Sequence, residues 1–188
     1  ALPGSSSYPA IDPQRSKIHK LCGEAVMNLL KEGIKPRDIM TKKAFENAAR
    51  IVAATGGSTN AVLHLPAMAH EAGIKFTIEE IEKIFHATPY FVDLKPGGKY
   101  VAYDVHMVGG VPVILKQLLD AGLLHGDCLT VTGKTQKENL KDMTEVELKK
   151  KLAILQESVR VIRFKAEGSK SKNVKESANL KKDIARIF

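Results

Sequence analysis

The residues with the clearest chemical potential form one short stretch, Gly56-Gly57-Ser58-Thr59-Asn60. Two hydroxyls and a carboxamide follow a pair of glycines there, directly before a segment with helical periodicity. Glycines allow a close backbone approach, and a helix start presents unpaired N–H groups and the positive end of the helix dipole. The stretch is therefore suited to hold an anion such as a carboxylate or a phosphate. The alternative interpretation is a tight turn that caps a core helix.

A helix is expected to follow this turn and to position its polar side chains. Ser58 or Thr59 can cap the helix start, because a hydroxyl accepts a free backbone N–H of the first turn, and Gly73 is a suitable end. The apolar residues of the segment recur three and four positions apart, at Val62, Leu65, Ala69 and Ala72. This spacing predicts an amphipathic helix with one buried face.

Helical periodicity also dominates the rest of residues 1–140. Caps, glycines and prolines predict four more helices, at Gln14–Glu32, from Thr41 to the glycine pair, from Thr77 to Pro89 and from Pro112 to Gly122. The extended candidates are few, namely Tyr90–Leu94, Ile74–Phe76 and Leu129–Val131. Two segments are expected to be a connector and a loop, Ile34–Asp38 and Asp104–Val111. The pattern indicates part of a layered α/β domain that is helix-rich and has an incomplete sheet.

Composition and charge exclude several classes of protein. The 188 residues fit one domain with or without an appendage, and no apolar run reaches the length of a membrane span. The net charge is +8, but residues 1–136 carry 15 basic and 13 acidic side chains, whereas residues 137–188 carry 14 and 8. The excess therefore lies in the tail, which is expected to be solvated or disordered. Neither a nucleic acid nor a membrane is expected as a partner.

Three sequence features could indicate nucleotide or metal binding, but each lacks residues that such a site requires. Thr132-Gly133-Lys134-Thr135 resembles the end of a P-loop, but Cys128 stands where that motif needs its first glycine. The run from His125 to Cys128 contains three ligand-type residues, but no partners elsewhere complete a metal site. Cys22 and Cys128 match no zinc spacing, which suits a reducing compartment or inert buried thiols. We therefore expect no metal ligand and no catalytic residue in this chain.

Six blocks of sequence, taken together, resemble the dihydroxy-acid dehydratase / phosphogluconate dehydratase family. They occur in the order and spacing of that family and are LPGSSSYPA, KPRDIMTKKAFENA, GGSTNAVLHLPAMAHEAGI, DLKPGGKY, DVHMVGGVP and GLLHGDCLTVTGKTQKENL. The second and last blocks look closest to the dihydroxy-acid dehydratases, and sugar-acid dehydratases are the near alternative. The resemblance covers residues 1–140 and fades beyond them.

The resemblance implies a fold and a reaction. Residues 1–140 would be the later part of a layered α/β/α N-terminal domain, and residues 141–188 a divergent basic tail, partly helical or disordered. The reaction would convert a 2,3-dihydroxy acid to a 2-keto acid in branched-chain amino-acid biosynthesis. The family uses an iron–sulfur cluster (2Fe-2S or 4Fe-4S) as Lewis acid, Mg²⁺ at the carboxylate end and a serine base.

The same resemblance implies that the chain is an internal fragment. The family's cluster cysteines lie before Ala1 and its catalytic serine lies after Leu140, so the isolated chain is expected to bind no cofactor and to be inactive. Ser58, Thr59 and Asn60 would hold substrate, and Ser5 and Ser6 would line the same cleft. The intact enzyme would be a homodimer or a higher homo-oligomer. It would be cytoplasmic, or located in a plastid or mitochondrion if the source is a eukaryote.

Three alternatives remain open on the sequence alone. The near alternative is that the chain is a segment of a sugar-acid dehydratase of the phosphogluconate type. It could also be a non-catalytic α/β module that captures an anion at the same helix start. A degenerate remnant without function is the third alternative.

Overall fold

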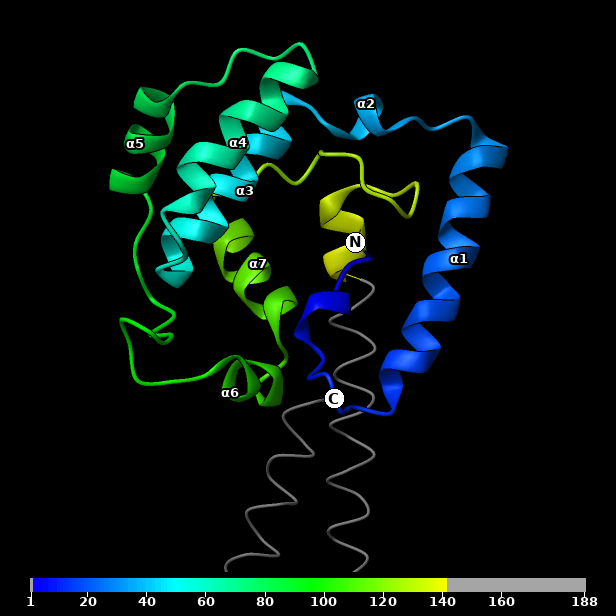
Figure 1. Cartoon of the computed structure of the whole chain (residues 1–188), viewed down its shortest axis with the longest axis horizontal. Coiled ribbons are helices and arrows are strands. Elements are labelled where there is room, and N and C mark those ends of the chain that lie inside the picture. The colour runs from blue at the N-terminus through cyan, green and yellow to red at the C-terminus, as the bar shows by residue number, and fades with distance from the viewer. Residues whose placement is uncertain (1, 142–188) are drawn as a thin grey trace, which may run out of the picture. The chain divides into compact units, whose positions relative to one another are not determined.

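Helices make up nearly all the regular structure of residues 2–141, the part of the chain that the computed structural model describes. In order they are η1 (Ser5–Ser7), α1 (Gln14–Glu32), α2 (Pro36–Ile39), α3 (Lys42–Thr55), α4 (Asn60–Glu71), α5 (Ile78–His86), α6 (Ala102–Met107) and α7 (Val111–Asp120) (Figure 1). Residues 136–141 are also helical. The prediction for the basic tail falls on residues 142–188, outside this part, so the division at residue 140 stays a prediction.

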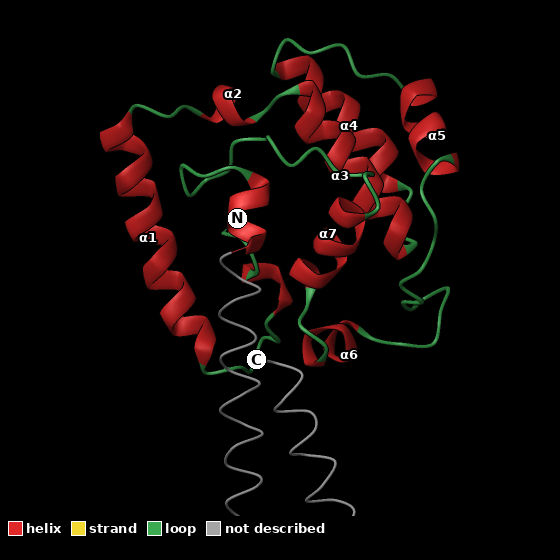
Figure 2. Ribbon diagram, turned by 180° about the vertical axis from the view of Figure 1, so that it is seen from behind, coloured by secondary structure: helices red, strands yellow, loops and turns green. Residues whose placement is uncertain are grey.

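Helix α3 is the element around which the described helices pack, and it contacts α4, α5 and α7 (Figure 2). One buried cluster joins α3 to α4 and α5 and consists of Phe45, Ala49, Leu65, Ala69, Phe76 and Ile81. A second cluster joins the end of α3 to α7 and the segment beyond it, and consists of Ala54, Ile114, Leu118, Leu124 and Leu140. Because α3 contributes to both clusters, it fixes the position of the turn that follows it.

The helix ends form as their capping residues predict. Thr41 Oγ1 accepts the N–H of Ala44 at 3.3 Å at the start of α3. At the start of α5, Thr77 Oγ1 accepts the N–H of Glu80 at 3.3 Å, and Glu80 Oε2 accepts the N–H of Thr77 at 2.9 Å. Gly33 ends α1 in the left-handed region, with φ 69°. These predictions are confirmed, and α1 has the predicted bounds.

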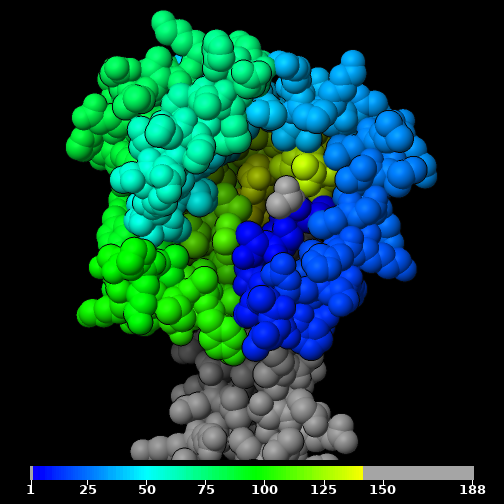
Figure 3. All heavy atoms as spheres, in the orientation of Figure 1, coloured from blue at the N-terminus to red at the C-terminus, as the bar shows by residue number. Residues whose placement is uncertain are grey.

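Helix α1 is amphipathic in sequence, but none of its residues is buried. Leu21, Val26 and Leu30 lie on its apolar face, yet they are 43%, 63% and 74% exposed. Figure 1 shows α1 apart from the group that α3, α4, α5 and α7 form, and in the space-filling view of Figure 3 its atoms (blue) lie on the opposite side from those of α4 and α5. The apolar face of α1 is therefore only partly covered, with Ile18, Cys22, Ala25 and Leu29 half-buried.

The helix-rich architecture with an incomplete sheet is confirmed, but the individual strand candidates do not become strands. Within residues 2–141, sheet pairing is limited to isolated bridges, Leu94 with Tyr100 and Leu129 with Thr135. The backbone N–H groups of Phe91 and Val92 both donate to the carbonyl of Ala54, at 3.2 and 3.1 Å. The Tyr90–Leu94 segment is thus held by the end of α3 rather than by a neighbouring strand.

Two segments predicted to be a connector and a loop contain short helices instead. Helix α2 lies within the expected connector, and the N–H of Lys35 donates to Asp38 Oδ2 at 2.8 Å. Helix α6 overlaps the expected glycine-rich loop, and the N–H of Val101 donates to Asp104 Oδ2 at 2.8 Å. In both cases an aspartate in the first turn satisfies an N–H that would otherwise be free, which favours the helix.

Candidate functional site

The candidate site is the turn between α3 and α4, and the glycine pair shapes it. Gly56 ends α3 in the left-handed region with φ 60°, where residues with a side chain are strained. Its N–H donates to the Ala53 carbonyl at 3.3 Å, and the N–H of Gly57 donates to the Val52 carbonyl at 2.8 Å. These bonds reverse the chain within two residues, so that Ser58 follows directly on the end of α3.

The N-cap residue of α4 is Thr59, one of the two predicted hydroxyl residues, but its side chain makes no capping bond. Ser58, one residue earlier, accepts the N–H of Asn60 with its Oγ at 3.2 Å and so satisfies the first N–H of the helix. The next N–H groups, of Ala61 and Val62, donate to the carbonyls of Ser58 and Thr59 at 3.0 Å each. The first turn of α4 therefore uses the N–H groups that the sequence suggested for an anion.

Several hydrogen-bond donors remain available at the start of α4 and in the two residues before it. Ser58, Thr59 and Asn60 are all exposed. Among residues 2–141, the backbone N–H groups of Ser58 and Thr59 have no hydrogen-bond partner, nor do the Thr59 hydroxyl and the Asn60 carboxamide. The turn thus presents two N–H groups, a hydroxyl and an amide together, a set that can bind carboxylate or hydroxyl oxygens.

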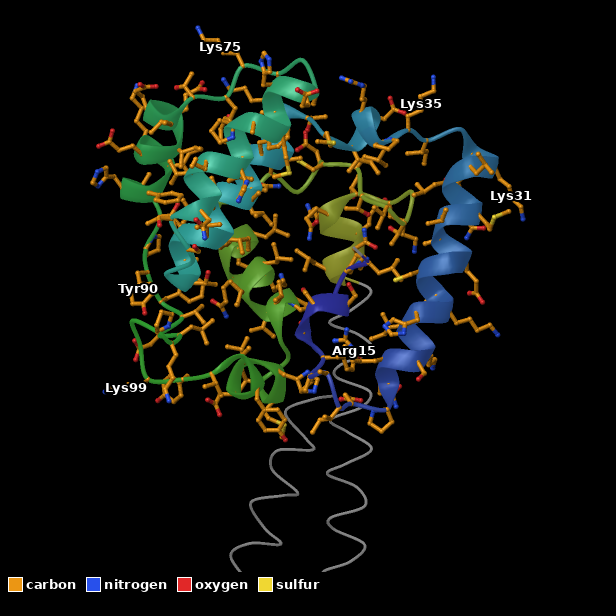
Figure 4. The ribbon with its side chains drawn as sticks, viewed as in Figure 1. Arg15, Lys31, Lys35, Lys75, Tyr90 and Lys99 are labelled. Carbon is orange, nitrogen blue, oxygen red and sulfur yellow. The ribbon has the colours of Figure 1, made fainter. Side chains whose placement is uncertain are left out.

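The segment after α5 supports this turn through a contact that no local sequence pattern predicts. A Cβ built on Gly56 would lie 2.7 Å from Cε2 of Tyr90, so the ring of Tyr90 rests directly against this glycine. Figure 4 shows Tyr90 on the segment that joins α5 to α6. The Tyr90 hydroxyl donates to Asp93 Oδ1 at 3.2 Å. The pKa of Tyr90 is raised, first by the partial loss of solvent and then by this bond to a carboxylate.

Ser5 and Ser6 lie in η1, which contacts α6 and the start of α7. Their neighbour Ser7 anchors this turn, because its Oγ accepts the N–H of Val111 at 2.9 Å. Ser5 is half-buried and Ser6 is exposed. In Figures 1 and 2, η1 and the α3–α4 turn stand apart with α7 between them. The structure of residues 2–141 does not join the two predicted sets of residues by any described contact.

The residues from His125 to Cys128 dock on α3. Asn47 donates from Nδ2 to the His125 carbonyl at 2.9 Å, and its Oδ1 accepts the His125 N–H at 2.8 Å. Glu46 Oε2 lies 2.6 Å from His125 Nε2, and Lys43 pairs with Asp127. The polar side chains of this loop are therefore engaged in attaching it to one face of α3.

The TGKT segment is likewise engaged in an internal network. Thr132 Oγ1 donates to Asn139 Oδ1 at 2.9 Å, and Asn139 Nδ2 donates to Thr130 Oγ1 at 2.8 Å. Asn139 is only 6% exposed. The threonines of this segment hold the chain together at this point and do not form a phosphate cradle.

The described residues do not fit an iron–sulfur cluster or a divalent ion. Within residues 2–141, no three side chains of His, Cys, Asp or Glu are placed to hold a metal. Cys22 is half-buried on α1, whereas Cys128 is buried and its sulfur accepts from Asn47 Nδ2 at 3.5 Å. Burial raises the pKa of the Cys128 thiol, which disfavours the thiolate that a metal requires.

The described helices also include no membrane span. Across residues 2–141, none of them is both long enough and apolar enough to cross a bilayer.

Comparison with known proteins gives a consistent set of relatives. The family described as "Dihydroxy-acid/6-phosphogluconate dehydratase N-terminal" matches residues 1–139. The chain is 62% identical over 143 residues to a dihydroxy-acid dehydratase of Pelagibacter ubique, and equally so to one of Parvibaculum lavamentivorans. It is 57% identical over 142 residues to one of Sulfurisphaera tokodaii. Each match covers 76% of this chain and 25% of the relative, so the chain spans about a quarter of the relatives' length.

Proposed function

Because the chain belongs to the dihydroxy-acid/6-phosphogluconate dehydratase family, we propose that it forms part of a hydro-lyase that converts a 2,3-dihydroxy acid to a 2-keto acid. The observation that carries the proposal is the 62% identity to proteins named dihydroxy-acid dehydratase. This identity favours the dihydroxy acids of branched-chain amino-acid biosynthesis over sugar acids as substrates. The isolated chain would be inactive, since it spans only 25% of these relatives.

In this proposal the α3–α4 turn binds substrate. The N–H groups of Ser58 and Thr59, the Thr59 hydroxyl and the Asn60 carboxamide are exposed and have no described partner. They can donate hydrogen bonds to carboxylate or hydroxyl oxygens and so hold the substrate in one orientation. Ser5 and Ser6 remain candidates for the same role, although η1 and the turn are separate in the described part.

The reaction needs groups that residues 2–141 do not supply. An iron–sulfur cluster and Mg²⁺, which the family resemblance implies, would act as Lewis acids on the departing hydroxyl and on the carboxylate. We place their ligands in other parts of the intact enzyme, because the described side chains include no fitting ligand set. The family resemblance implies the same place for the serine base. The contribution of this chain is to bind and orient the acid. We propose that the intact enzyme is a homo-oligomer. Its location would be the cytoplasm, or a plastid or mitochondrion if the source is a eukaryote.

The role of the turn can be tested in a grafted dehydratase. In this graft, the matching residues of this chain replace the aligned segment of the Pelagibacter ubique relative. Ser58→Ala combined with Thr59→Val removes two hydroxyls from the turn. If they bind substrate, the double variant lowers kcat/KM for a 2,3-dihydroxy acid by roughly tenfold for each 1.4 kcal/mol of lost transition-state stabilisation.

A capping role alone gives a different result in the same experiment. Loss of an N-cap costs about 0.5–2 kcal/mol of stability. A lower melting temperature with unchanged kcat/KM would therefore show that the turn only caps α4 and would contradict the proposed binding role. Assays with a sugar acid beside the dihydroxy acid distinguish the two substrate classes. A graft that binds either acid without turnover would instead favour the anion-binding module.

A further inference from the structure

Tyr90 is the side chain that covers the Gly56 turn from outside α3 and α4. Gly56 has φ 60°, and the position of a Cβ on it would lie 2.7, 3.4 and 3.5 Å from Cε2, Cζ and Cδ2 of Tyr90. The edge of the ring therefore occupies the space that a side chain at position 56 would need, and only glycine leaves this space free. Tyr90 stays 51% exposed, so it is not a core residue.

The backbone next to Tyr90 attaches the same segment to the end of α3. The N–H groups of Phe91 and Val92 donate to the Ala54 carbonyl at 3.2 and 3.1 Å. The Tyr90 hydroxyl donates to Asp93 Oδ1, three residues further along the same segment, at 3.2 Å. The backbone bonds of Phe91 and Val92 thus hold the segment so that the Tyr90 ring lies against Gly56, the residue that sets the exit of the chain from α3.

We propose that Tyr90 is a positioning residue for the substrate-binding turn, with its ring holding Gly56 so that Ser58, Thr59 and Asn60 keep their direction. This inference rests on the proposed function of that turn. The turn has no cover of its own, since Gly57, Ser58, Thr59 and Asn60 are all exposed. If the turn shifts, its donors no longer meet the substrate oxygens at hydrogen-bond distance, so loss of the ring contact weakens substrate binding.

The test compares three variants in the grafted dehydratase. Tyr90→Ala removes the ring, and Tyr90→Phe keeps the ring and removes only the hydroxyl. Tyr100→Ala is the matched control, because Tyr100 is 55% exposed, follows in the same loop and makes its described hydrogen bonds through its backbone. We expect Tyr90→Ala to raise KM by about tenfold with kcat changed little, which indicates loss of uniform substrate binding. Tyr90→Phe and Tyr100→Ala should keep the KM of the unsubstituted graft.

Amide hydrogen exchange of residues 56–62 gives a second readout that needs no substrate. Tyr90→Ala should speed exchange of this turn, whereas Tyr90→Phe and Tyr100→Ala should not. Unchanged exchange and unchanged KM in Tyr90→Ala would overturn the inference. A fall in kcat with lower melting temperature but constant KM would also overturn it, since that pattern indicates a structural role alone. If Tyr90→Ala speeds exchange of the turn but Ser58→Ala/Thr59→Val leaves KM unchanged, Tyr90 positions the turn and the turn does not bind substrate. That result would uphold the inference and refute the proposed function.

Discussion

Asn47 shows how a single side chain attaches a loop to a helix. Its carboxamide accepts the N–H of His125 at 2.8 Å and donates to the carbonyl of the same residue at 2.9 Å. One side chain thus satisfies both backbone groups of a half-buried residue, in the way a neighbouring strand would. The attachment places Leu124 and Cys128, which are 7% and 8% exposed, on the inside of the structure.

Removal of this carboxamide should be costly. Asn47→Ala leaves the N–H and carbonyl of His125 without their partners, and we expect the free energy of unfolding to fall by about 1–3 kcal/mol. Asn47→Asp should also destabilise, because a carboxylate cannot donate to the carbonyl. Urea denaturation of the full chain measures both variants, with Asn28→Ala on the exposed face of α1 as the control. An Asn47→Ala variant as stable as this control would contradict the role assigned to the carboxamide.

At the scale of elements, α3 is central because its residues face two clusters at once. Phe45 and Ala49 belong to the cluster with α4 and α5, and Ala54 belongs to the cluster with α7. Small residues such as Ala49 and Ala54, each 0% exposed, let neighbouring segments approach closely. The turn after α3 is therefore anchored by the best-packed helix among the described ones.

Helix α5 allows a matched test of this packing, because it carries the same residue type on both faces. Ile81 is 1% exposed and Ile78 is 58% exposed. Ile81→Ala should lower the free energy of unfolding by about 2–5 kcal/mol, because it removes buried methyl groups and leaves a cavity. Ile78→Ala should change it by no more than about 0.5 kcal/mol. Thermal unfolding of both variants measures the difference, and equal effects would refute the assigned burial.

The elements that local sequence determines are the ones that could be predicted. The bounds of α1 and the caps at Thr41 and Thr77 follow from residues within a few positions of each other. A strand needs a pairing partner that local sequence does not show, and the Tyr90–Leu94 segment bonds to the end of α3 instead of to another strand. The turn at the glycine pair was predictable for the same local reason. The contact of Tyr90 with Gly56 was not, because 34 positions separate the two residues.

At the scale of the whole molecule, the chain matches only one part of its relatives. Its relatives are about four times as long as the segment that it matches. Residues 1–136 are nearly neutral, with 15 basic and 13 acidic side chains, so the acid binding that we propose there would depend on directed donors more than on net charge. We therefore expect activity only where the rest of the proposed enzyme is present.

We expect this chain to serve as the matching segment of a working dihydroxy-acid dehydratase. The most direct measurement is the rate at which the grafted dehydratase, without further substitutions, forms 2-keto acid from a 2,3-dihydroxy acid. At 62% identity we expect a rate within about tenfold of the unaltered Pelagibacter ubique relative, which corresponds to less than about 1.4 kcal/mol of lost transition-state stabilisation. A graft that is folded and carries its cofactors, yet forms no 2-keto acid, would contradict the claim.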